Sequence, residues 1–301
     1  MVKVALLSKQ QFNLFLLKYL QVVERFYETK KMEVPLTTNQ VTNEWLKSAL
    51  SHLGETIKVK ELKSVKNEGG VLSNVFKAKV DIDGNEEKLF IKIMPSDQGQ
   101  KVFIENHPLD KIEIQTYDKT LPMLQSFEKQ EMGTMKLQEM TCRYFGGKYC
   151  LDKESRGFYL ILEDISDTHQ MPNLDKGLTD DQVVDSLRKL AYFHGLSYCF
   201  AKKNNVNYLE HHIIPYFAFL EDTEAQVFIA DLFKRCIDQL ESRKENELAS
   251  VLKKLSGNYK EKFKWAYDGR CGDFLTHGDI WSNNVMFSGP NVSRSWNDNV
   301  R

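Results

Sequence analysis

The sequence predicts an α+β fold with two lobes, the first built on an antiparallel sheet and the second mainly helical. Two observations support this prediction. Residues 55–95 contain three β-rich runs, and the turn Asp83–Asn85 between the second and third runs is a good hairpin signal. After a connector near 163–170, the sequence is mostly helical through about residue 262. The cleft between two such lobes is where a ligand would bind.

Apolar periodicity and residues that start or stop helices give the elements of the first lobe. Pro108 should start or restart the helix in which it lies. In chain order, the first lobe should contain a helix over Thr42–Leu53, strands over Ile57–Lys66, Val75–Ile82 and Lys88–Met94, a helix over 101–119, and strands over Thr134–Phe145 and Gly157–Leu162.

The second lobe should open with a long helix after Thr179, a good N-cap that is followed by acidic residues in the first turn. Val183, Leu187 and His194 mark one face of this helix. We interpret His194 as a core histidine with a hydrogen-bond partner, because buried polar groups are usually satisfied.

Composition excludes several classes of protein. The formal net charge is −1, without the basic excess of a nucleic-acid binder. The cysteines are five in number and form no CxxC pair, which is typical of reduced thiols in a cytoplasmic protein. Residues 4–23 are too often interrupted by polar side chains to span a membrane, and they predict a soluble amphipathic helix, with membrane docking as the alternative.

The segment HGDIWSNN carries the clearest chemistry. Asp279 lies five residues before Asn284, with His277 two residues before the aspartate. The catalytic loop of protein kinases has the same spacing, in H-R-D-x-x-x-x-N. A loop of this length can place a carboxylate at the nucleophile and an amide oxygen on a metal ion beside the phosphates. We interpret His277 as a residue that braces the loop.

Other residues of the first lobe fit the same chemistry. Lys92, in LFIKIMP, lies mid-strand and faces opposite to its two isoleucine neighbours. Glu113, in the next predicted helix, is its candidate partner, although an edge-strand lysine and a solvated acid are the alternatives. The turn NEGGVLSN could cover phosphates with its backbone amides. The candidate residues of this turn are Gly69, Gly70, Ser73 and Asn74.

Together, HGDIWSNNVMF, LFIKIMP, KIEIQTYDKTLP and YLILEDIS resemble the ecdysteroid-kinase-like family, from about residue 38 to 287. These small-molecule kinases are similar to choline kinases and aminoglycoside phosphotransferases and have a protein-kinase-like fold. The resemblance implies four segments: an N-terminal helical extension (1–37), an N-lobe with hinge (38–165), a partial helical C-lobe with the catalytic loop (166–287), and an atypical tail (288–301).

The resemblance also implies a function, the ATP- and Mg²⁺-dependent phosphorylation of a hydroxyl on a small molecule. Asp279 would be the catalytic base and Asn284 a magnesium ligand. Lys92 would hold the α- and β-phosphates, oriented by Glu113. The hinge whose backbone meets the adenine would be Glu163, Asp164 and Ile165. The acceptor stays open among a steroid alcohol, a choline-like amine and a detoxification substrate.

One part of the family pattern is missing. The family continues past the catalytic loop to an Asp-Phe-Gln motif whose aspartate bridges magnesium and the phosphates. Here Asp298 is the only acidic residue after Asp279, with no apolar strand before it. We therefore expect little or no kinase activity from the chain as written. The alternatives are a nucleotide-binding protein of the same fold without catalysis, a protein kinase, and a nonfunctional fragment.

Overall fold

The computed structural model describes residues 34–65, 72–107, 109–152, 156–173, 177–208, 221–267, 273–280 and 282–288. From Pro35 onward these residues belong to one unit. The predictions for the N-terminal helix, for Gly69 and Gly70 and for the tail after Ser288 lie outside the described residues. The four predicted segment boundaries stay predictions.

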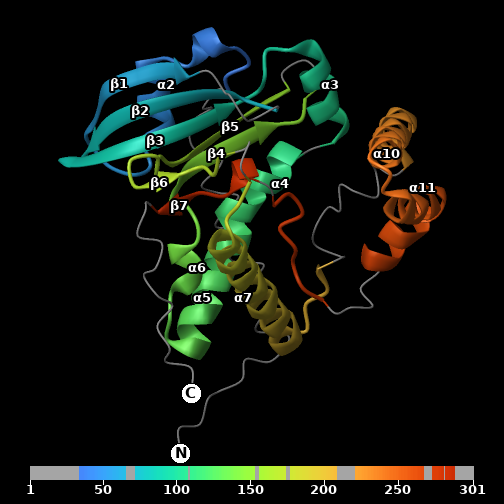
Figure 1. Ribbon diagram of the computed structural model, residues 1–301. Coiled ribbons are helices and arrows are strands. Elements are labelled where there is room, and N and C mark those ends of the chain that lie inside the picture. The colour runs from blue at the N-terminus through green and yellow to red at the C-terminus, as the bar shows by residue number, and fades with distance from the viewer. Residues whose placement is uncertain are drawn as a thin grey trace, which may run out of the picture. The chain divides into compact units, whose positions relative to one another are not determined.

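The first lobe is built on an antiparallel sheet of five strands in the order β1-β2-β3-β5-β4 (Figure 1). The three antiparallel strands expected within 55–95 are confirmed as β1, β2 and β3. Because β3 is the central strand, Lys92 is not an edge-strand lysine. The strand bounds are β1 Ile57–Val65, β2 Asn74–Ile82, β3 Asn85–Ile93, β4 Tyr144–Cys150 and β5 Gly157–Glu163.

The hairpin between β2 and β3 turns on two residues, Asp83 and Gly84, whose φ angles are both positive, at 50° and 88°. Two-residue hairpin loops of this kind need positive φ at both positions, which glycine adopts without strain and aspartate tolerates. Asn85 already pairs with Ile82, so β3 begins three residues earlier than the Lys88 predicted from the sequence.

The two faces of the sheet carry different layers. Ile91 and Ile93 are fully buried on the face covered by α2, Asn43–Leu50, where Trp45 meets Tyr159 edge-on at 5.3 Å between ring centroids. Leu160 lies opposite Lys92 in the ladder, and on that other face it packs with Ile104 and Ile114. Both faces of β5 are therefore buried, and Lys92 on the neighbouring β3 points to the α4 side.

Helices α3, α4 and α5 follow β3. The predicted restart near Pro108 is confirmed, because α3 ends before this residue and α4 begins directly after it, while Pro108 itself lies outside the described residues. The helical path continues through a π-helical turn at Thr116–Thr120, beyond the predicted end at 119, and stops where Gly133 takes a left-handed conformation at φ 67°. The helices are α3 Gln98–Asn106, α4 Leu109–Gln115 and α5 Leu121–Met132.

The predicted strand Thr134–Phe145 is wrong for most of its length. Lys136–Glu139 forms the short helix α6, and β4 begins only at Tyr144. The cause is a tertiary contact, because the carboxylate of Glu128 on α5 accepts hydrogen bonds from the backbone amides of Lys136 (2.6 Å) and Leu137 (3.0 Å). A buried carboxylate thus satisfies the amides at the start of α6.

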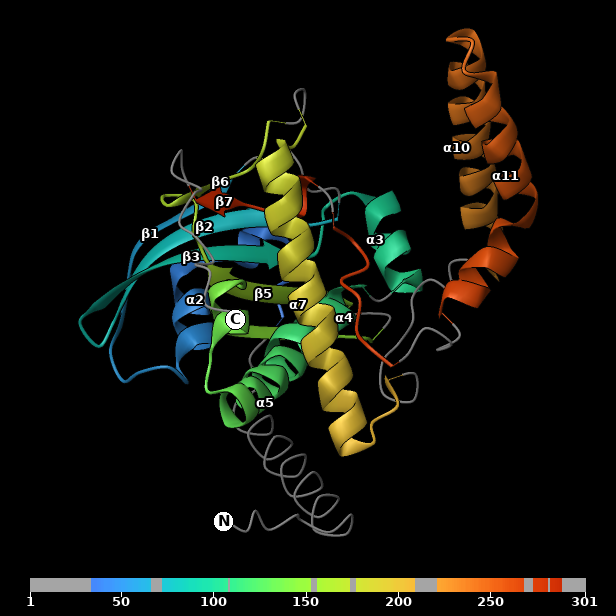
Figure 2. The same ribbon diagram turned by 60° about the horizontal axis from the view of Figure 1, so that its bottom comes forward.

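The long helix after Thr179 is confirmed as α7, Asp180–Asn204, and Thr179 forms a capping box with Gln182. Its C-terminal half packs beside α5 (Figure 2). There the ring of Phe200 meets that of Phe127 edge-on, with 5.3 Å between centroids. Val183 and Leu187 remain 39% and 59% exposed, so the buried surface of α7 lies nearer its C-terminal end than the apolar pattern suggests.

The remaining described elements are two short 3₁₀ helices, Thr38–Gln40 and Ser282–Asn284, the helices α10 and α11, which pack against each other, and a two-stranded ladder of β6 with β7. These observations confirm the predicted α+β class. Among the described residues, no helix is long and apolar enough to cross a membrane. The bounds are β6 His169–Gln170, α10 Thr223–Ser242, α11 Asn246–Tyr267 and β7 Phe287–Ser288.

Candidate active site

Lys92 and Glu113 form the ion pair that the sequence predicted. The Nζ atom of Lys92 on β3 lies 2.7 Å from Oε1 of Glu113 on α4, and the two side chains are 27% and 37% exposed. Strand alternation turns Lys92 away from the buried Ile91 and Ile93 and toward α4. The pair therefore presents a fixed ammonium group at the surface of the first lobe.

Helix α4 is held in place by apolar and ionic contacts on either side of Glu113. Ile114 is 3% exposed and packs in the cluster with Leu160 and Leu162. One turn earlier, Asp110 accepts a hydrogen bond of 2.7 Å from Arg156, which lies just before β5. Both charged side chains of that pair are almost fully buried. These contacts fix the orientation of the helix that carries Glu113.

The side chain of Asn74, a candidate phosphate-binding residue from the turn before β2, makes structural hydrogen bonds. Its Nδ2 donates to the carbonyl oxygen of Met94 (3.0 Å) and to Oγ of Ser96 (2.8 Å). These bonds tie the start of β2 to the segment after β3. Ser73 precedes Asn74 within the described residues, and a role of the turn's backbone in phosphate binding stays a prediction.

Asp279 and Asn284 come together as their spacing predicted. The Asn284 side chain donates from Nδ2 to both the backbone oxygen (2.9 Å) and Oδ2 (2.8 Å) of Asp279. Gly278 has φ 78°, a conformation that glycine adopts without strain, which gives a physical reason for glycine at the position where protein kinases have arginine. The loop thus holds one carboxylate in a defined orientation, with the amide nitrogen committed and the amide oxygen left to other partners.

His277 braces this loop, because its Nδ1 accepts a hydrogen bond of 3.3 Å from the backbone nitrogen of Asp279. Loss of hydration lowers the pKa of His277, against the negative charges of Asp279 and Glu113, which raise it. A lowered pKa favours the neutral imidazole, whose unprotonated Nδ1 can accept this hydrogen bond.

Helix α7 anchors the segment that leads into the loop. The buried Ser197 accepts a hydrogen bond of 3.0 Å at its Oγ from the backbone nitrogen of Leu275, and its own hydroxyl donates to the His194 carbonyl. The His194 ring lies 5.1 Å from that of Phe274. Within the described part of the chain, Nε2 of His194 is buried and has no hydrogen-bond partner. The prediction that the ring of His194 is satisfied by hydrogen bonds is therefore wrong for this nitrogen. Burial lowers the pKa of His194, which favours its neutral form.

The predicted hinge leaves the sheet at the end of β5. Asp164 continues the ladder by donating its backbone nitrogen to the carbonyl oxygen of Lys88 at 2.9 Å. The carbonyl oxygen of Ile165 accepts from the amides of Thr168 (3.0 Å) and His169 (2.9 Å), which closes a tight turn. Glu163 at the strand end lies 3.5 Å from Arg143. The turn then enters β6, whose partner β7 follows the Asp279 loop.

Comparison with known proteins decides the assignment. Residues 68–294 match the family model described as the ecdysteroid kinase-like family.

The chain belongs to the ecdysteroid kinase-like family.

The match covers more than half of the chain and includes Lys92, Glu113, the hinge and the Asp279 loop. It confirms the resemblance found in the sequence and, with the antiparallel sheet and the helices that follow it, the protein-kinase-like fold. No curated protein and no solved structure matches the chain.

The residues of the ecdysteroid kinase-like site suit a hard cation that is shared with phosphates. Asp279 offers carboxylate oxygens and Asn284 an amide oxygen, both of which Mg²⁺ accepts. In the part of the chain that the structure describes, no cluster of three or more acidic, histidine or cysteine side chains could hold a metal alone. Mg²⁺ commonly binds through one or two protein oxygens, water and substrate phosphates, and the donor set fits that pattern.

Two residues of the site were missed by sequence reasoning. Ser197 gave no signal, because a serine within an apolar helix face carries no spacing motif. Lys77 on β2 lies on the same sheet face as Lys92, because Val75 pairs with Lys92 and Lys77 lies two residues after Val75 on the same strand.

A pocket of about 380 Å³ between α10 and α11 is lined by none of the candidate site residues.

Proposed function

We propose that this member of the ecdysteroid kinase-like family binds ATP and transfers its γ-phosphoryl group to a hydroxyl of a small molecule. The observation that supports this most strongly is the combination of the Lys92–Glu113 pair with the Asp279–Asn284 pair. Each pair combines residue types that phosphoryl transfer uses, and the match to the family supports the reaction class.

The proposed roles follow from the chemistry of each group. Lys92 supplies a positive charge to the α- and β-phosphates, and Glu113 keeps its ammonium oriented. Asp279 accepts the proton of the acceptor hydroxyl as that oxygen bonds to the γ-phosphorus. The bond from the γ-phosphorus to the bridging oxygen breaks, and ADP keeps that oxygen. Asn284 holds the Asp279 carboxylate through Nδ2, and the backbone of Glu163, Asp164 and Ile165 meets the adenine.

Magnesium, when bound, supplies charge neutralisation at the phosphates. Asn284 is the residue that would hold it, together with phosphate oxygens and water, which leaves Asp279 free to accept the proton. We place the protein in the cytoplasm, since none of the four described cysteines forms a disulfide. The acceptor is a small molecule with a free hydroxyl, of steroid, choline-like or xenobiotic type.

A direct test is transfer from γ-labelled ATP to a panel of hydroxyl-bearing small molecules, with Asp279→Asn as the matched control. Label transfer that depends on Asp279 supports the proposal. ATP binding is measured on the same protein, so that nucleotide binding and phosphoryl transfer are distinguished. A chain that neither binds ATP nor transfers label overturns the proposal, whereas binding without transfer leaves a nucleotide-binding protein of this family.

A further inference from the structure

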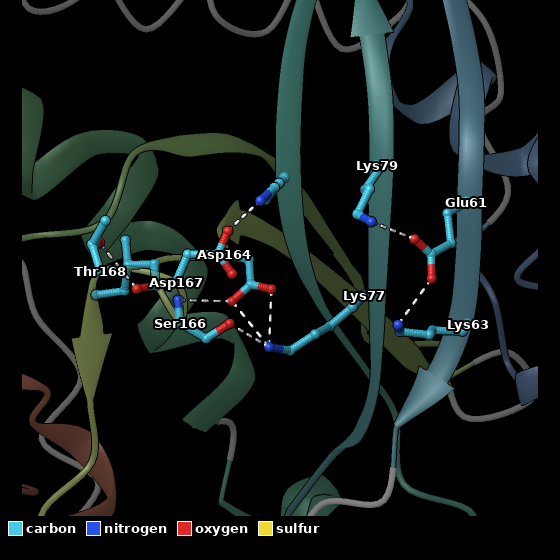
Figure 3. Close-up of polar contacts among 10 residues, drawn as sticks. Glu61, Lys63, Lys77, Lys79, Asp164, Ser166, Asp167 and Thr168 are labelled. Carbon is cyan, nitrogen blue, oxygen red and sulfur yellow. Dashed lines mark hydrogen bonds and ion pairs between the residues drawn. The ribbon is translucent and has the colours of Figure 1, made fainter.

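Lys77 on β2 makes three polar contacts with the segment that follows β5. Its Nζ lies 2.9 Å from Oδ2 and 3.1 Å from Oδ1 of Asp164, and 2.7 Å from Oγ of Ser166 (Figure 3). Asp164 also accepts a hydrogen bond of 3.1 Å at Oδ1 from the backbone nitrogen of Ser166. One lysine on a strand therefore joins two residues of the connector that are more than eighty positions away in the sequence.

The contacted segment is an ordered turn. The Ile165 carbonyl accepts from two amides, and Lys88 on β3 forms a second ion pair with Asp167. Lys77 and Asp164 are 28% and 13% exposed at their side chains, less than the 42% and 62% of Lys88 and Asp167. Ion pairs that are less exposed are screened less by water and salt. Of these two ion pairs between the sheet and the turn, the one made by Lys77 is thus the stronger.

Lys77 is also on the side of the sheet where the site lies. Val75 pairs with Lys92 in the ladder and Lys77 pairs with Phe90, so Lys77 and Lys92 project from the same face. Lys79, the next residue on this face, pairs instead with Glu61 of β1 at 2.9 Å (Figure 3). Lys79 therefore offers a matched control. It has the same strand, the same face and the same kind of ion pair, and among the described residues it has no hydrogen bond or ion pair with the connector.

We propose that Lys77 is a positioning residue that fixes the Asp164–Thr168 turn against β2 and so sets the place of the connector backbone beside the nucleotide base. This inference rests on the proposed function, in which that backbone meets the adenine. The three N–H donors of the Lys77 ammonium group are used by the contacts to the connector, so phosphate binding is left to Lys92. Its loss should weaken recognition of the base and leave recognition of the phosphates intact.

The test compares two ligands, because adenosine carries the base without phosphates. Affinities of ATP and adenosine are measured by calorimetry for the unsubstituted chain, Lys77→Met, Lys79→Met and Lys92→Met. We expect Lys77→Met to weaken both ligands by a similar factor of about ten, Lys79→Met to leave both unchanged, and Lys92→Met to weaken ATP alone. Loss of ATP affinity with unchanged adenosine affinity in Lys77→Met would overturn the inference, as would no loss of either.

Hydrogen exchange of the ligand-free protein gives a readout that does not need the nucleotide. The amides of Thr168 and His169 are protected by the Ile165 carbonyl. Lys77→Met should speed their exchange by about tenfold while Lys79→Met does not. Equal exchange in the two variants would contradict the inference. If the unsubstituted chain binds neither ligand, the proposed function fails, and the exchange measurement alone decides whether Lys77 holds the turn.

Discussion

The Nζ atom of Lys92 lies 2.7 Å from Oε1 of Glu113, and this ion pair joins the central strand of the sheet to α4. Both side chains are about one-third exposed, so water screens their attraction and the pair contributes little to stability. The ion pair instead serves to orient the Lys92 ammonium group. A lysine ammonium held by one carboxylate keeps two N–H donors for a phosphate, at a position set by two rigid elements.

The first prediction concerns this pair. Lys92→Met should reduce ATP affinity by about 10- to 100-fold, because a charge-assisted contact to phosphate is lost. Glu113→Gln should reduce it less, since the ammonium remains but is no longer oriented by a charge. Both variants should change the free energy of unfolding by less than about 1 kcal/mol. Calorimetric titration and urea unfolding check the two parts, and an ATP affinity unchanged by Lys92→Met would remove this residue from the site.

The second prediction separates binding from chemistry at the loop. Asp279→Asn removes a proton acceptor without changing shape, so any measurable phosphoryl transfer should fall by about 100-fold or more. ATP affinity should stay within a few-fold of the unsubstituted protein. Asn284→Ala should weaken ATP binding when magnesium is present and have a smaller effect without it. A variant Asp279→Asn with full transfer activity would show that another group takes the proton.

Much of this site was predictable from short-range patterns. Alternation on one strand gave the direction of Lys92, and a five-residue spacing gave the Asp279–Asn284 pair, because both depend on local backbone geometry. Helix α6 was not predictable, since the capping carboxylate of Glu128 comes from another helix. The Lys77 contacts also join distant segments, and no local pattern announces which lysine of an alternating strand will reach the connector.

The third prediction concerns Glu128, which is fully buried and accepts hydrogen bonds from Thr134, Lys136, Leu137 and Tyr192. Burial alone would raise its pKa, but these bonds outweigh burial and the net shift is downward. The stabilisation is therefore complete above the unfolded pKa of about 4.3 and is lost as pH falls through the lower folded pKa.

Glu128→Ala should cost about 2–4 kcal/mol, because several donors lose their partner. Its unfolding free energy should also depend less on pH in the acidic range. Glu131→Ala, on the same helix, removes an exposed partner of Lys203 and should cost less than about 1 kcal/mol. Denaturant unfolding between pH 3 and pH 7 measures both effects, and equal costs for the two variants would contradict the role given to Glu128.

The fourth prediction concerns the buried ion pair between Asp110 on α4 and Arg156, which lies just before β5. Arg156 and Asp110 are 6% and 1% exposed at their side chains, and Arg156 also donates to the carbonyl oxygens of Cys150 and Ile104. Arg156→Met should cost about 3–5 kcal/mol by leaving a buried charge unpaired. The double variant Asp110→Leu/Arg156→Met should recover part of this loss. A double-mutant cycle by urea unfolding gives the coupling, and strictly additive costs would mean that the pair does not act as a unit.

The most direct measurement is the thermal unfolding of the 301-residue chain with increasing ATP and magnesium, beside Lys92→Met as the matched control. A ligand that binds only the folded state adds about 2.7 kcal/mol at one hundred times its dissociation constant, which raises the Tm of a chain of this size by several degrees. We predict a magnesium-dependent rise in the unsubstituted chain that is much smaller in Lys92→Met. An unchanged Tm across millimolar MgATP, in a chain that unfolds cooperatively, would contradict nucleotide binding at this site.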